Sequence, residues 1–89
     1  MKVIVSVLGK DKIGIIAKVC NFLAENDCNI LDISQNIVQD YLNMIMIVDI
    51  VNPNMTFDNF DDGMGKLAEE IGVSIKVQNS AIFESMHRI

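Results

Sequence analysis

Two cysteines and one histidine are the residues of this 89-residue chain with the most obvious potential for nucleophilic or metal chemistry. Cys20 and Cys28 are eight positions apart, and His87 stands alone near the end of the chain. A zinc site needs about four clustered ligands, and a nucleophile needs a neighbouring base that activates it. Ser6 and Ser34 also lack a recognisable base. The sequence therefore predicts no catalytic residue, no metal site and no cofactor.

The loop after the first apolar stretch carries the groups best suited to hold a small ligand. Lys10, Lys12 and Lys18, three of the seven basic residues, fall in or just after it. Gly14 stands where a helix begins, and without a Cβ it lets a ligand approach the free N–H groups there. A helix N-terminus suits a carboxylate, and Asp11 could accept a hydrogen bond from an α-ammonium group. The chemistry indicated is the binding of an amino acid.

The same residues have simpler structural interpretations. Gly14 can be only a tight junction between a strand and a helix, and Asp11 can cap that helix. Lys10 and Lys12 can be solvated loop charges, and Asn29 can be a turn residue. From the residues alone, both interpretations stay open.

Changes in hydrophobic period divide the chain into six elements. Two β-branched stretches are apolar on both faces and predict central strands, while a third alternates and predicts an edge strand. A turn is expected at Gly9–Lys10–Asp11, and Gln39–Asp40 forms a tight hairpin link. The second helix is expected between a cap at Thr56 or Asn54 and a Gly72 stop. The expected order is a strand at 2–8, a helix at 14–26, strands at 29–38 and 41–50, the second helix, and a strand at 73–79.

This order predicts an α+β fold of the ferredoxin-like βαββαβ type. Right-handed crossovers place both helices on one face of a four-stranded antiparallel sheet. The central strands are apolar on the other face too, so something must cover it. We expect both the segment Ser80–Ile89, read as a short C-terminal helix, and a second subunit to contribute. The domain itself is assigned to residues 1–79 and the helical extension to 80–89.

The composition argues against nucleic acid and membranes as partners of this chain. A net charge of −5 disfavours nucleic acid, because an acidic surface repels phosphate. The longest apolar run, Met44–Val48, is far shorter than the roughly 20 residues of a membrane span, so no membrane contact is expected. Nothing indicates secretion, and we expect both cysteines to be reduced and the protein to be cytoplasmic.

Three functions of ferredoxin-like domains require residues that this chain does not have. A heavy-metal carrier needs a CxxC pair in the first loop, and an RNA-recognition domain needs exposed aromatic residues on the central strands. This chain has neither pattern, with Tyr41 alone at the start of the third strand. An acylphosphatase needs an arginine near the first loop, but the only arginine is Arg88.

With these functions set aside, the chain resembles the ACT domain family. Residues Val7 to Ile16 are similar to its motif G-x-D-x-x-G-I/L-V/I, and Asn26 to Ile33 to the motif x-x-N-I-x-x-I before the second strand. Residues Ser80 to Met86 look like the end of small stand-alone ACT proteins related to the glycine-cleavage repressors. The chain departs from the family at Ile13, where many members have proline or alanine. In the family, ligands lie between subunits, against the first loop and the start of the second strand.

The expected function is a regulatory domain without enzyme activity that binds a small molecule, an amino acid, at the interface of a homodimer. The alternative is a structural dimerisation or protein-interaction module without a ligand. A further protein partner could contact the C-terminal extension. The residues predicted to bind the ligand are Lys10, Asp11, Lys12, Ile13, Gly14, Ile15, Asn29 and Ile30.

Overall fold

The computed structural model describes residues 1–79, and the helix expected at 80–89 lies outside the described residues. Six elements follow one another in the expected order, which confirms the βαββαβ fold. They are β1 (Lys2–Lys10), α1 (Ile15–Glu25), β2 (Cys28–Val38), β3 (Tyr41–Ile50), α2 (Phe57–Ile71) and β4 (Ser74–Asn79).

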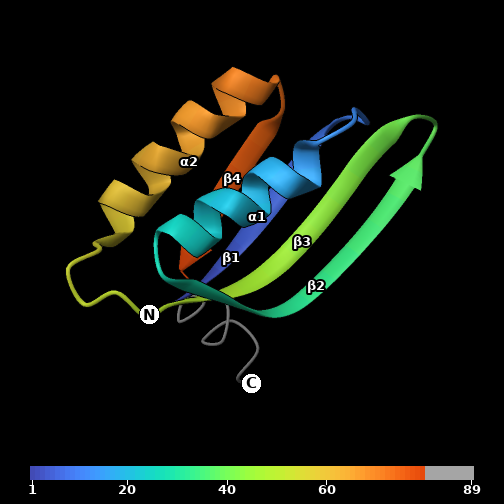
Figure 1. Cartoon of the computed structure of the whole chain (residues 1–89). Coiled ribbons are helices and arrows are strands. Elements are labelled where there is room, and N and C mark those ends of the chain that lie inside the picture. Colours follow the sequence, from blue (N-terminus) through green and yellow to red (C-terminus); the bar gives the residue numbers. More distant parts are fainter. Residues whose placement is uncertain (80–89) are drawn as a thin grey trace.

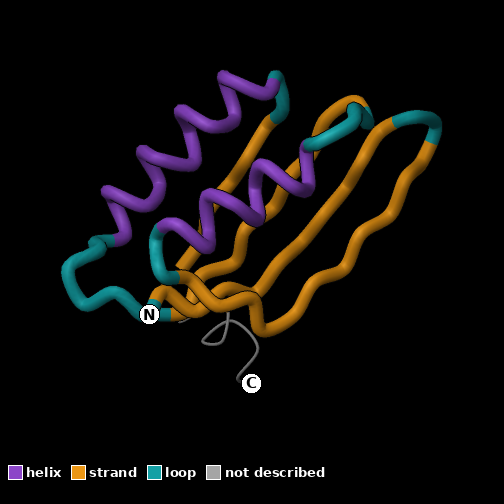
Figure 2. Tube along the Cα trace, in the orientation of Figure 1, coloured by secondary structure: helices purple, strands orange, loops and turns teal. Residues whose placement is uncertain are grey.

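The strands form one antiparallel sheet in the order β2-β3-β1-β4. Strands β1 and β3 are central and β2 is an edge strand, as predicted. Both helices cover the same face of the sheet (Figure 1). The β1–α1 loop and the β2–β3 turn lie at one end of the sheet, and the α1–β2 and β3–α2 connections lie at the other (Figure 2).

The core lies between the sheet and the helices. Alternate residues of β1 and β3 point into it, because side chains alternate across a strand. Helices α1 and α2 contribute one apolar stripe each at a spacing of three to four residues. The buried residues are Val3, Val5, Val7, Ile15, Val19, Leu23, Leu42, Met44, Met46, Val48, Ile50, Phe60, Met64 and Ile71.

Two glycines allow segments that are distant in sequence to pack closely. The turn expected at Gly9–Lys10–Asp11 was wrong, since β1 continues through Lys10. A Cβ at Gly9 would lie 2.6 Å from a methyl carbon of Val73, so this glycine makes room for the approach to β4. A Cβ at Gly63 would lie 2.7 Å from the ring of Phe22, at the contact between α1 and α2.

The ends of α2 are as the sequence predicts. The Thr56 hydroxyl accepts a hydrogen bond from the backbone N–H of Asn59 at 3.1 Å, which caps the N-terminus. Gly72 ends the helix with a left-handed φ of 72°, and its N–H donates to the carbonyl of Ala68.

Strand β2 contains an irregularity that the alternating pattern does not show. The pairing shifts between Ile30 and Asp32, so Leu31 is an extra residue in a bulge. After the bulge Ile33 pairs with Met46 and therefore lies on the helix side of the sheet. Ile33, Ile37 and Leu31 nevertheless remain 44%, 57% and 47% exposed, and this edge carries an apolar surface.

Candidate ligand-binding site

The N-terminus of α1 lacks the cap that α2 has. Gly14 is its N-cap residue, with φ 90° and ψ −1°, and no side chain caps the helix. The first helical bond runs from the N–H of Lys18 to the carbonyl of Gly14 at 3.0 Å, and the N–H of Ile15 reaches Lys12 only at 3.5 Å. The N–H groups of Ile16 and Ala17 fall in the first turn, where an α-helix offers no acceptor of its own. This helix end is therefore open to an anionic group.

Within residues 1–79, the space beside Gly14 is open. A Cβ added at Gly14 would meet no heavy atom within 4 Å. Ile13 is fully exposed, and Ile16 is 37% exposed. The first turn also contains no acidic residue that would repel a carboxylate. A small ligand can reach the free N–H groups from solvent.

The structure changes two expectations about the loop. Gly14 does not lie inside the helix but before it, in the left-handed region, where any L side chain is strained. The alternative that Asp11 caps the helix is wrong, because Gly14 occupies the cap position. The N–H of Asp11 instead donates to the carbonyl of Asp40 at 2.7 Å and ties the loop to the β2–β3 turn.

The two lysines of the loop point to different places. The ammonium nitrogen of Lys12 lies 3.2 Å from the position that a Cβ at Gly72 would take, beside the C-terminal end of α2. A cation is favoured there by the helix dipole. Lys10 is exposed at the end of β1, opposite Tyr41. Neither lysine forms a salt bridge within residues 1–79, so both remain free to pair with a ligand.

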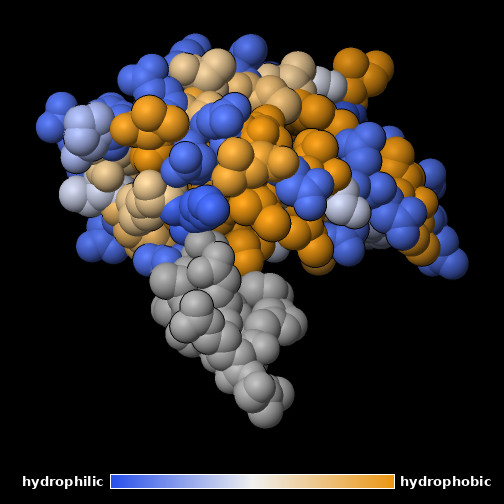
Figure 3. Space-filling model, turned by 90° about the horizontal axis from the view of Figure 1, so that it is seen from below, coloured by the Kyte–Doolittle hydropathy of each residue, from blue (hydrophilic) through white to orange (hydrophobic). Residues whose placement is uncertain are grey.

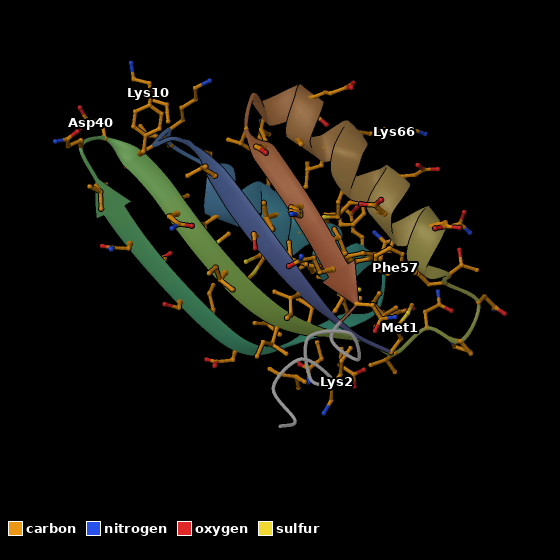
Figure 4. All side chains as sticks on the ribbon, turned by 180° about the vertical axis from the view of Figure 1, so that it is seen from behind. Met1, Lys2, Lys10, Asp40, Phe57 and Lys66 are labelled. Atoms are coloured by element: carbon orange, nitrogen blue, oxygen red, sulfur yellow. The ribbon has the colours of Figure 1, made fainter. Side chains whose placement is uncertain are left out.

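Asn29 and Ile30 lie far from the rest of the predicted site. Asn29 pairs with Asp49, and Asp49 pairs with Lys2, so Asn29 is level with the start of β1. Lys10 is eight residues along the same strand, about 26 Å away at the rise of a β-strand. Figure 4 shows Met1 and Lys2 at one end of the sheet and Lys10 and Asp40 at the other. One subunit therefore brings residues 10–15 together and holds Asn29 and Ile30 at the opposite end.

The site has one neighbour that the sequence interpretation missed. Asp40, in the β2–β3 turn, is joined to the loop through its carbonyl. The sequence contained the information needed to predict this. A two-residue link between β2 and β3 puts Gln39 and Asp40 at the end of the sheet where β1 ends. The free N–H of Ala17 was missed as well, since it depends on the cap geometry at Gly14.

The cysteines show no arrangement for catalysis or metal binding. Partial burial, followed by the nearby carboxylates of Asp27 and Asp49, raises the pKa of the Cys28 thiol above its ordinary value of 9.0. Such a thiol stays protonated at neutral pH and is a poor nucleophile. Cys20 and Cys28 are both free thiols. Within the described residues, no three His, Cys, Asp or Glu side chains come together as metal ligands.

Comparison with known proteins identifies the family. The ACT domain sequence profile matches residues 2–78. A UPF0237 protein of Clostridium acetobutylicum is 48% identical over 89 residues, which cover 100% of both chains. The chain belongs to the ACT domain family. No helix in residues 1–79 is long and apolar enough to cross a membrane.

Solved structures agree with this assignment. An ACT domain protein from Streptococcus pneumoniae superposes with a TM-score of 0.85 at 37% identity, covering 94% of each chain. A formyltetrahydrofolate deformylase from Pseudomonas syringae gives 0.82 at 25% identity, but this chain covers only 28% of that enzyme. A chain assigned as a glycine cleavage system transcriptional repressor gives 0.77 at 14% identity, over 86% of this chain and 44% of that one, which shows the shared fold.

Proposed function

We propose that this ACT domain protein is a cytoplasmic regulator without catalytic activity that binds an amino acid between two copies of the chain. The observation that carries the proposal is the uncapped N-terminus of α1 at Gly14, with free N–H groups and open space above them. The carboxylate of the ligand accepts hydrogen bonds from this helix end. The Asp11 carboxylate in the loop and the exposed ammonium of Lys10, the last residue of β1, can pair with the charges of the ligand.

The rest of the site comes from the second subunit. Strand β2 is an edge strand whose outer backbone groups are available for pairing, and it carries the exposed residues Leu31, Ile33 and Ile37. Antiparallel pairing of two β2 edges about a twofold axis buries these side chains. It also sets Asn29 of the partner subunit about three strand spacings, or roughly 14 Å, from the β1–α1 loop, instead of about 26 Å within one chain. The dimer thus brings the two separated parts of the predicted site toward each other.

A second candidate function is a dimerisation or protein-interaction module that has no ligand. The position of Lys12 favours it, because an ammonium group beside the end of α2 already has a structural role there. The same exposed β2 edge would serve this function equally well. The two candidates differ in whether a small molecule stabilises the protein.

A thermal-shift screen of the purified protein against the twenty amino acids separates them. At 100 times its Kd a ligand adds about 2.7 kcal/mol, which raises the Tm by several degrees. The control is the carboxamide of any active amino acid, which keeps the side chain and the amine but lacks the anion. We expect the amino acid to raise the Tm and its carboxamide not to. No shift with any of the twenty would favour the module without a ligand.

A further inference from the structure

The face of the sheet opposite the helices carries an apolar patch at its centre. Ile4 of β1 pairs with Ile47 of β3, and Ser6 pairs with Ile45, so these residues share that face. We call Ile4, Leu8, Ile45 and Ile47 the open-face patch. Ile4 is largely buried, but Ile47, Ile45 and Leu8 are 36%, 46% and 54% exposed.

Exposing such an apolar surface to water is energetically unfavourable. Contiguous exposed apolar side chains usually mark a place where another segment or molecule docks. Figure 4 views the sheet from this side, and both helices lie behind it. Figure 3 gives a different view, from below, in which apolar side chains also gather between polar ones. The helices of the domain cannot cover this patch, so its occupant must come from elsewhere.

We propose that the last ten residues of the same chain, 80–89, dock on the open-face patch. Strand β4 ends at Asn79, which pairs with Val3, one residue from Ile4. From there, Ile47 is about 10 Å away across two strands, and Leu8 is about 17 Å away along β1. Ten residues span about 15 Å as a helix and up to about 33 Å when extended. The whole patch is within reach of the segment.

The composition of the segment matches the patch. Residues 80–89 contain four large apolar side chains, at Ile82, Phe83, Met86 and Ile89. Ile82, Met86 and Ile89 are spaced four and three apart, as on one side of a helix. The segment carries Arg88 and Glu84, and beside the patch lie Asp32, which pairs with Ile47, and Lys76, which pairs with Ser6, so each charge has a possible partner of opposite sign. The segment thus offers apolar surface and charges that can be paired.

A second copy of the chain is the competing occupant. A covalently attached segment acts at an effective concentration in the millimolar range, whereas a second copy is present only at the concentration of the protein. The attached segment therefore has the advantage under ordinary conditions. With the open face covered from within, assembly is left to the β2 edge, and the protein stops at a dimer. This inference does not depend on whether an amino acid binds.

Cysteine alkylation tests the proposal in the full chain. In a Cys20→Ser, Cys28→Ser background, Ile47→Cys reports on the patch and Lys66→Cys, on α2, is the matched exposed control. If the segment is docked about 90% of the time, the cysteine at position 47 reacts about ten times more slowly than when the segment is released. We expect the added double substitution Ile82→Asp, Met86→Asp to raise that rate about tenfold and to leave the rate at position 66 unchanged.

The dependence of the rate on protein concentration identifies the occupant. Protection by the attached segment is the same at every protein concentration, and this result supports the proposal. Protection that grows with concentration would assign the patch to a second copy and overturn it. Equal rates at positions 47 and 66 before the double substitution would also overturn it, because the patch would then be uncovered. The concentration dependence and the comparison of positions 47 and 66 are both measured with the C-terminal segment unchanged. They can therefore be interpreted even if the double variant fails to fold.

Discussion

At the scale of single residues, Gly14 connects the backbone to the proposed function. Its φ of 90° lies in the left-handed region, which glycine adopts without strain and other residues avoid. That conformation turns the chain from the loop into α1 without a capping side chain. The same backbone conformation of Gly14 therefore makes the tight junction and leaves the helix end open for the proposed ligand.

Asparagine at position 14 separates these two roles, because it tolerates the left-handed region better than most residues. Gly72 has a similar φ of 72°, and a Cβ there would lie 3.2 Å from the Lys12 ammonium, so Gly72→Asn is the control for the backbone strain alone. We expect each variant to lose about 1 kcal/mol of stability. Only Gly14→Asn should also lose the ligand-induced rise in Tm, since its side chain occupies the space over the helix end. If both variants keep that rise, the ligand binds elsewhere.

Cys28 should make the stability of the fold depend on pH in the alkaline range. Its pKa is raised by burial, and further by Asp27 and Asp49, so the folded state prefers the neutral thiol. In the unfolded chain this thiol ionises from its ordinary pKa of 9.0 upward. The stability contributed by the raised pKa is therefore complete below that value and is lost as the pH rises through the folded pKa.

We expect Cys28→Ser to lose less stability than the wild type as the pH rises above about 8. Urea unfolding at several pH values measures this difference. Identical pH profiles for the wild type and Cys28→Ser would contradict the assignment.

At the scale of elements, the β2–β3 turn holds two non-glycine residues in a backbone conformation that L residues rarely adopt. Gln39 and Asp40 both have positive φ, at 50° and 67°, as a two-residue turn of type I′ requires. Asparagine and glycine are the preferred pair in such turns, and glutamine is a poor choice. The carbonyl of Asp40 also accepts the hydrogen bond from Asp11, so the turn helps to position the β1–α1 loop.

Replacing the turn by Asn-Gly, through Gln39→Asn and Asp40→Gly, should stabilise the protein by about 1 kcal/mol. Thermal unfolding should show a Tm several degrees higher, with ligand binding retained because the carbonyl at position 40 remains. The opposite change, Asp40→Val, puts a β-branched residue at positive φ and should lower the Tm. A lower Tm for the Asn-Gly variant would show that the side chains of Gln39 and Asp40 contribute more than the backbone strain removes.

At the scale of the whole molecule, the separation of Asn29 from the β1–α1 loop is the reason for proposing a site that two subunits share. In this proposal the second subunit docks on the exposed apolar residues of β2. Ile33→Lys places a charge in the middle of this edge at a position that is already 44% exposed in one subunit, so the monomer should still fold. The matched control is Gln78→Lys on β4, the other edge of the sheet.

Sedimentation equilibrium at micromolar concentration should give twice the chain mass of 9.9 kDa for the wild type and for Gln78→Lys. Ile33→Lys should sediment as a monomer and lose the ligand-induced rise in Tm. A dimeric Ile33→Lys protein would move the interface away from β2.

The sequence predicted what depends on local pattern and missed what depends on contacts between distant segments. The hydrophobic period predicted the element order and the central position of β1 and β3, and residue types predicted the Gly72 stop and a cap at Thr56 or Asn54. It could not show that Gly9 and Gly63 make room for Val73 and Phe22, because those partners are remote in the chain. The bulge at Leu31 and the distance from Asn29 to Gly14 likewise follow only from strand pairing.

The most direct test of the account is a ¹H–¹⁵N correlation spectrum of the protein titrated with the amino acid that raises its Tm. The account predicts that the backbone amides of Ile16 and Ala17, together with Gly14 and Ile15, shift first and most. Hydrogen bonds from the free N–H groups of Ile16 and Ala17 to the carboxylate cause the shifts, and the carboxamide of the same amino acid should not produce them. Ligand-induced shifts confined to other parts of the protein, or the same shifts with the carboxamide, would contradict the account.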